Sequence, residues 1–208
     1  MLSMMINGAV AALSVVAWLM LVLGAGDPDH LAARGMESLK YFTVLSNLFS
    51  GVISFVYLVC HLMASVEASD LILALKLMAA SAVLLTFFTV ILLLGPKFGW
   101  GQMYKGGNLW MHLVLPLLAA IDCMLFVPVG SLPFVATFVA LAPCFVYGAW
   151  YLWMVVRHGA EQNGKVYDFY GFLRWGKEKT PVVAVAMLTQ SWVLGLMVWL
   201  GSRAFCHM

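Results

Sequence analysis

Hydrophobic residues fill six long runs of this chain, and polar residues gather between them. The runs cover residues 4–24, 41–63, 71–95, 109–128, 132–156 and 182–204. Each run is close to the roughly 20 residues that an α-helix needs to cross the hydrocarbon core of a bilayer. Because only helices and closed barrels satisfy their backbone in lipid, the pattern predicts an all-α protein. We expect one domain, residues 1–208, built as a bundle of six transmembrane helices.

The composition also indicates a membrane protein. Of the 208 residues, 64% are hydrophobic and 10% are charged, against roughly 45–50% and 25% in soluble domains. The formal net charge of +2 is too small to suggest nucleic acid as a partner. The cysteines have no metal-type spacing, and we interpret them as small buried apolar residues: Cys60, Cys123, Cys144 and Cys206. We therefore expect no metal site and no cofactor.

Positive charges are divided unevenly between the connections. Nine of the eleven Lys and Arg residues lie at the first, third and fifth connections: Arg34, Lys40, Lys97, Lys105, Arg157, Lys165, Arg174, Lys177 and Lys179. By the positive-inside rule these connections are cytoplasmic and both termini lie outside. No Lys or Arg precedes the first run, so we expect a retained helix there rather than a cleaved signal peptide. The fifth connection also suits contact with anionic lipid headgroups through its aromatic residues, Phe169, Tyr170, Phe172 and Trp175.

Small polar residues interrupt the second run at helical spacing. They are Thr43, Ser46, Asn47, Ser50 and Ser54, which share one face of a helix with 3.6 residues per turn. In lipid such a face should point into the bundle or toward a wet cavity. Because similar stripes are common where membrane helices pack together, this one taken alone favours packing over chemistry.

The fourth run carries a second polar group. Asn108 and His112 are four residues apart and share a face, and Pro116 removes a backbone donor one turn later. Asp122 is the one carboxylate well inside a predicted span, where a proton, a cation or a hydrogen-bond network is the usual partner. It follows His112 by ten residues, about 15 Å along a straight helix, so we do not expect it to orient that imidazole.

Thr43 and His112 are predicted at the same depth, each about one turn inside the cytoplasmic side. A hydroxyl becomes a useful nucleophile when a base takes its proton, and an imidazole can take that proton and return it to a leaving alcohol. Asn47 or Asn108 could donate to an oxyanion or orient the histidine, and the spacing does not choose between them. Ser46 and Asp122 are candidates for supporting roles.

These segments resemble the androgen-induced and androgen-dependent family of integral membrane threonine hydrolases and its bacterial relatives. The matching segments are LKYFTVLSNL, with Thr43, and NLWMHLVLPLLAAID, with His112. The loop VYDFYGFL, residues 166–173, is similar to the family's aromatic segment before the last span, although Asp168 stands where the family tends to have Pro. Asp168 could support His112 from the cytoplasmic mouth of the cavity or be a solvated loop charge, and we favour the solvated charge. The resemblance implies a Thr nucleophile, a His base and a substrate that is an ester of a fatty acid with a hydroxy fatty acid. It also implies a bacterial inner membrane.

A lipid ester substrate needs a cavity among the helices. Candidate lining residues in spans three, five and six are Thr86, Thr89, Tyr147, Trp150, Gln190 and Trp192. The alternative function is a small proton-coupled transporter or lipid-binding protein that uses Asp122 and His61. The chain has no evident internal repeat, which weakens the transporter alternative.

Overall fold

The computed structural model describes residues 1–24, 35–63 and 69–206, apart from the side chains of Arg174, Trp175 and Lys177. Arg34 lies outside the described residues. Six helical segments are long and apolar enough to cross a membrane, and they form the bundle of an integral membrane protein. They are Leu2–Leu23, Phe42–Leu62, Asp70–Phe98, Gly107–Leu125, Phe134–His158 and Thr180–Phe205. Each end lies within about three residues of its predicted position, so the all-α prediction is confirmed.

Several of these segments are composite. The first, second and sixth are the single helices α1 (Leu2–Leu23), α2 (Phe42–Leu62) and α9 (Thr180–Phe205). The third joins α3 (Asp70–Thr89), the π-helix η2 (Val90–Leu94) and α4 (Gly95–Phe98). The fourth joins α6 (Gly107–Leu109), the π-helix η3 (Trp110–Val114) and α7 (Leu115–Leu125). The fifth joins the 3₁₀-helix η5 (Phe134–Ala140) and α8 (Leu141–His158).

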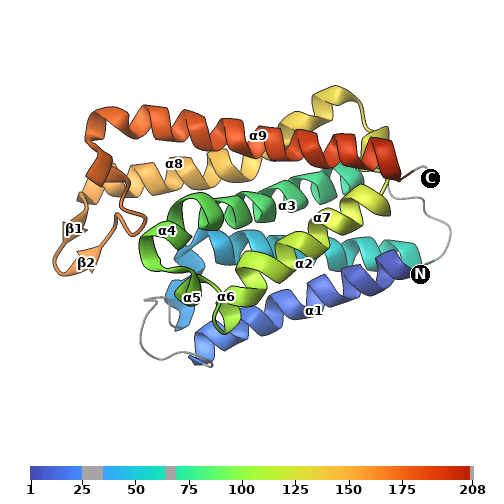
Figure 1. Ribbon diagram of the computed structural model, residues 1–208, viewed down its shortest axis with the longest axis horizontal. Helices are drawn as coiled ribbons and strands as arrows, with labels where there is room; N and C mark the ends of the chain where they lie inside the picture. The colour runs from blue at the N-terminus through green and yellow to red at the C-terminus, as the bar shows by residue number, and fades with distance from the viewer. Residues whose placement is uncertain (25–34, 64–68, 207–208) are drawn as a thin grey trace.

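Shorter elements occupy the connections. They are η1 (Gly35–Lys40), α5 (Trp100–Met103), η4 (Val129–Ser131), β1 (Glu161–Gln162), β2 (Lys165–Val166), η6 (Phe172–Trp175) and η7 (Lys177–Lys179). The strands β1 and β2 pair antiparallel across Asn163 and Gly164. Both turn residues have positive φ, 52° and 74°, which the Asn-Gly pair tolerates. Figure 1 places this hairpin at one end of the bundle, which we call the hairpin end; α1 begins and α9 finishes at the opposite end.

Each π-helix comes directly before a helix with Pro at its second position. Leu115 N–H donates to the Trp110 carbonyl, five residues back, and Gly95 N–H donates in the same way to Val90. Pro116 and Pro96 follow these donors and supply no N–H of their own. The wider turn therefore accommodates each proline without ending the helix. The sequence predicts a loosened helix near Pro116 but not this π-helical form.

Helices α1 and α2 pack very closely. A Cβ added to Gly51 of α2 would lie 1.9 Å from the Ser14 Oγ of α1, so only glycine fits there. Ser46, Asn47, Ser50 and Ser54 of the polar stripe are all buried, as a face turned into the bundle should be. The thiols follow the prediction only in part, because Cys123 and Cys144 are buried whereas Cys60 and Cys206 are half-buried.

Candidate functional site

A cavity of about 270 Å³ lies at the hairpin end, between the start of α2, the end of α3, the middle of α8 and the start of α9. Its walls are mainly aliphatic and aromatic. Seven of its lining residues carry a hydroxyl group: Thr43, Thr86, Thr89, Tyr147, Tyr151, Tyr170 and Thr180. Lys97 of α4 also lines it. Such a lining suits an apolar chain with a small polar group.

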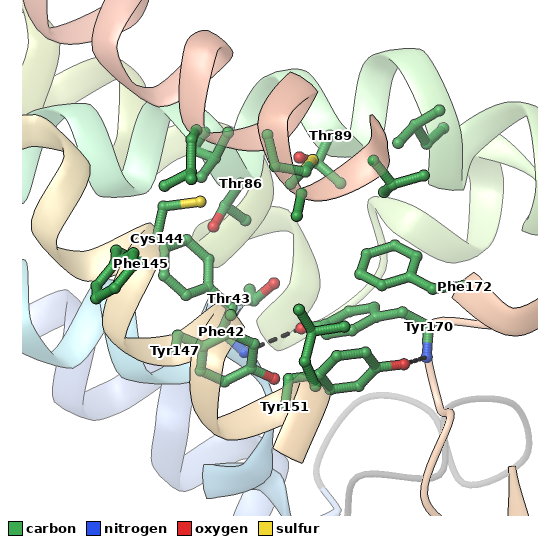
Figure 2. Close-up of a pocket in the computed structure, with 18 of the residues that line it drawn as sticks. Phe42, Thr43, Thr86, Thr89, Cys144, Phe145, Tyr147, Tyr151, Tyr170 and Phe172 are labelled. Atoms are coloured by element: carbon green, nitrogen blue, oxygen red, sulfur yellow. Dashed lines mark hydrogen bonds between the residues drawn. The ribbon is translucent and has the colours of Figure 1, made fainter. Parts of the chain in front are cut away.

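Thr43 is the second residue of α2, and its side chain lines this cavity (Figure 2). Its backbone carbonyl accepts two hydrogen bonds, from Ser46 Oγ at 3.1 Å and from Asn47 Nδ2 at 2.7 Å. Ser46 in turn lies 3.2 Å from the Thr86 hydroxyl. The first turns of α2 are therefore fixed by side chains around Thr43, while the Thr43 hydroxyl itself remains at the cavity wall.

His112 lies in the middle of the π-helix η3, and its side chain is only 6% exposed. Its Nδ1 is 2.8 Å from the backbone carbonyl of Met103. A carbonyl can only accept, so Nδ1 carries the hydrogen and Nε2 carries the free lone pair. The ring is thus held in the tautomer that a general base requires.

Asn47 joins Thr43 to the π-helix that carries His112. In an α-helix the Met111 carbonyl would accept from Leu115, but that N–H donates to Trp110. The Met111 carbonyl accepts instead from Asn47 Nδ2, at 3.1 Å. Asn47 therefore supplies the donor that the π-helix removes. One amide hydrogen of Asn47 is bonded to the Thr43 carbonyl and the other to the Met111 carbonyl, so neither is available to an oxyanion.

Thr43 of α2 and His112 of η3 lie on neighbouring helices but do not form a hydrogen bond with each other. Within residues 35–63 and 69–206, no hydrogen bond joins the Thr43 hydroxyl to the imidazole, and His112 is not among the residues that line the cavity. Asn47, bonded to the carbonyls of Thr43 and Met111, is therefore the link between the segments that carry the two residues. Thr89 Oγ1 and Asn47 Oδ1 are buried without a partner in the described part of the chain.

Asp122 lies in a different place, toward the opposite end of the bundle. Its Oδ2 is 2.8 Å from Lys76 Nζ, and it also accepts from Asn7 at 2.8 Å, while Ser3 donates to Oδ1 at 2.7 Å. Lys76 donates further to Asn7 at 2.6 Å. Asp122 is thus one half of a buried ion pair and has no contact with Thr43. His61 is exposed and stacks on Tyr57 instead.

The cavity includes some predicted lining residues and not others. Thr86, Thr89 and Tyr147 line it, but Trp150, Gln190 and Trp192 do not. Trp150 is 37% exposed on the outward edge of α8. Trp192 lies beyond the cavity, where it donates to Thr137 Oγ1 at 3.2 Å. Gln190 lies one helical turn past Met187 on α9, beyond Leu188, the last residue of this helix that lines the cavity. The Asn108 side chain makes no hydrogen bond within the described residues and lies outside the cavity.

Sequence reasoning treated the loop before α9 as a membrane-surface segment and missed its part in the cavity. Asp168, interpreted there as a solvated charge, is half-buried and accepts from Tyr151 Oη and from the N–H groups of Phe172 and Leu173. The solvated interpretation is therefore wrong. These bonds turn the loop back so that Tyr170 and Phe172 line the cavity (Figure 2). The aromatic content of the loop was visible in the sequence, but its direction was not.

Comparisons of the chain with family models, with curated proteins and with solved structures find no match.

Proposed function

We propose that this protein hydrolyses carboxylic esters of lipids, with Thr43 as the nucleophile and His112 as the general base. The observation that carries the proposal is the Thr43 hydroxyl in the wall of an apolar cavity, joined through Asn47 to the helical turn of His112. Acyl transfer needs these two groups together. Apo enzymes often hold them farther apart than the complex with substrate does.

In the proposed reaction the Thr43 oxygen attacks the ester carbonyl as Nε2 of His112 takes its proton. The tetrahedral intermediate collapses to an acyl-threonine, and the imidazolium returns the proton to the departing alkoxide. Water then attacks the acyl carbon as the same histidine takes its proton, the C–O bond to Thr43 breaks, the fatty acid leaves, and the proton returns to the Thr43 oxygen. The Met103 carbonyl stabilises the imidazolium through the hydrogen on Nδ1.

The cavity favours an amphiphile as substrate, such as a fatty acid ester of a hydroxy fatty acid. Its acyl chain would pack against aliphatic side chains of α8 and α9, and its polar end would lie toward Lys97. We propose that the hairpin end faces the cytoplasm and that the membrane is a bacterial inner membrane; the distribution of positive charges supports this orientation.

Fluorophosphonate labelling of membranes that contain the protein tests this function. We expect labelling of the unmodified protein, loss of labelling in Thr43→Ala, and a loss of about 10²–10⁴-fold in rate in His112→Ala. The matched control is Thr189→Ala, which changes an exposed threonine on α9 and should be labelled as strongly as the unmodified protein. Thermal unfolding in detergent checks that each variant is folded. Undiminished labelling of folded Thr43→Ala would exclude Thr43 as the nucleophile.

A lipid-binding protein without chemistry is the second candidate. The missing hydrogen bond between Thr43 and His112 favours it. It predicts that lipid copurifies with the protein and remains intact, and that Thr43→Ala changes neither the amount nor the identity of this lipid. Release of free fatty acid by the unmodified protein, but not by Thr43→Ala, would exclude it.

A further inference from the structure

The hydroxyl of Tyr170 lies beside the residue that precedes Thr43. The N–H of Phe42 donates to Tyr170 Oη at 2.9 Å (Figure 2). Phe42 begins α2, where the first N–H groups have no partner in the helix and Tyr41 offers no side-chain cap. Tyr170, Phe42 and Thr43 all line the same cavity. A phenol from a distant loop is thus brought to the backbone next to the proposed nucleophile.

The hydrogen atoms of the tyrosine hydroxyls in this cavity can be accounted for one at a time. Tyr147 Oη donates to the Lys40 carbonyl at 2.6 Å, and Tyr151 Oη donates to Asp168. The Tyr170 hydroxyl interacts with the neutral hydroxyl of Tyr147, and among the described residues no carbonyl or carboxylate accepts its hydrogen. Because Asn47 has committed both amide hydrogens to carbonyls, Tyr170 is the better donor for a group that reacts in the cavity.

We propose that Tyr170 donates a hydrogen bond to the oxyanion that forms when Thr43 attacks the ester, an inference that rests on the proposed function. As the C–O bond to Thr43 forms, the carbonyl π pair moves to its oxygen, and the Tyr170 hydroxyl stabilises the resulting charge. The phenol keeps its proton throughout. When the intermediate collapses, the C=O bond re-forms and the alkoxide leaves with the proton that His112 took from Thr43.

The surroundings of Tyr170 suit a donor. The Phe42 N–H that donates to the phenol oxygen polarises the O–H bond and strengthens it as a donor. Burial raises the pKa of Tyr170 to about 12, so the hydroxyl stays protonated at neutral pH. Tyr41, just before α2, and Tyr147 and Tyr151 of α8 face it, and Asp168 of the same loop is bonded to Tyr151. Tyrosine hydroxyls are among the side-chain donors known from oxyanion holes.

Asp168 and Tyr151 hold Tyr170 in this position. The Tyr170 N–H donates to Tyr151 Oη at 3.3 Å, and Asp168 accepts from the backbone on the other side of Gly171. The loop is thereby fixed on both sides of the phenol. Asp168 and Tyr151 are positioning residues for the proposed donor.

Tyr170→Phe tests the proposal because it removes one hydroxyl and keeps the ring. We expect kcat for a lipid ester such as a p-nitrophenyl acyl ester to fall about 10²–10³-fold, while KM changes less than about threefold. Tyr41→Phe is the matched control, since Tyr41 packs edge-on against Tyr170 but does not line the cavity. It should keep kcat within about threefold of the unmodified protein. A Tyr170→Phe enzyme that keeps kcat within this range would overturn the proposal.

A second measurement distinguishes a hydrogen bond from Tyr170 to the oxyanion from a purely structural role of Tyr170 in capping α2. Difluorotyrosine at position 170 keeps the ring and the oxygen that accepts from Phe42, but its phenol ionises at lower pH. If Tyr170 donates to the oxyanion, the alkaline fall of kcat moves to lower pH with this substitution; a role in helix capping alone leaves that fall in place. Thr43→Ala is assayed alongside: continued hydrolysis there rejects the proposed function, whereas an inactive Thr43→Ala with an unchanged Tyr170→Phe rejects only the role of Tyr170.

Discussion

Asn47 shows how a single polar residue can be necessary inside an apolar helix. Its side chain supplies hydrogen atoms to two carbonyls, one in its own helix and one in the π-helix of the neighbouring span. Among the described residues the Met111 carbonyl has no other donor, because the Leu115 N–H donates to Trp110 and Pro116 has no N–H. The amide therefore satisfies the backbone that positions His112.

Asn47→Leu should lower the free energy of unfolding by about 1–3 kcal/mol, because it leaves the buried Met111 carbonyl without a donor. Thermal or denaturant unfolding in detergent measures the change. Ser50→Ala is the control, because Ser50 is buried on the same face one turn later and has no comparable link. If the two variants unfold alike, the Asn47 bonds do not support the helix pair.

At the scale of elements, the π-helix η3 turns His112 within a span that would otherwise be regular. Pro116→Ala restores a backbone N–H and allows this turn to return to the α-helical pattern. We expect the ester-hydrolysis rate to fall at least about tenfold because the imidazole shifts, while the unfolding temperature stays equal or rises. Pro133→Ala, at the start of η5 near the opposite end, should leave the rate unchanged. An unaltered rate in Pro116→Ala would show that the π-helix is dispensable.

The boundaries of the spans were predictable from the sequence, whereas the local forms within them were not. Hydrophobic length alone places helix ends within about three residues, because lipid requires backbone satisfaction along the whole run. The π-helices depend on which carbonyl finds a side-chain donor in another helix. Trp150 and Trp192 were assigned to the cavity by residue type, but their positions follow from helix rotation and from where the cavity ends. Tyr170 enters the cavity through contacts of Asp168 that no local pattern contains.

For the whole molecule, the ion pair of Lys76 and Asp122 connects three spans. The nitrogen and oxygen are 2.8 Å apart, and both side chains are at most 3% exposed. Through Ser3 and Asn7 the pair also holds α1 against α3 and α7. The sequence identified Asp122 as a buried acid in need of a partner but did not identify Lys76, since the two lie 46 residues apart along the chain.

Removing one member of this pair should be far more costly than removing both. We expect Lys76→Met to destabilise the protein by about 3–5 kcal/mol, because the carboxylate is left buried and unpaired, and the double variant Lys76→Met/Asp122→Leu to recover most of that loss. The exposed pair of Lys40 and Glu37 is the comparison, and Lys40→Met should cost at most about 1 kcal/mol. Denaturant unfolding in detergent measures all three. A double variant as unstable as Lys76→Met would contradict this account.

The same pair constrains the way the chain enters the bilayer during synthesis. A lysine or aspartate costs about 2.5–3.5 kcal/mol when it enters alone at the centre of an inserting helix, which is an upper bound for Lys76 and Asp122 because each lies nearer one end of its span. The span with Lys76 is made first, so its charge has to stay near water or near Asn7 of the first span until the span with Asp122 emerges. The third and fourth spans should therefore leave the translocation channel for lipid together. In a chain truncated before Asp122, the third span should insert into the bilayer less efficiently.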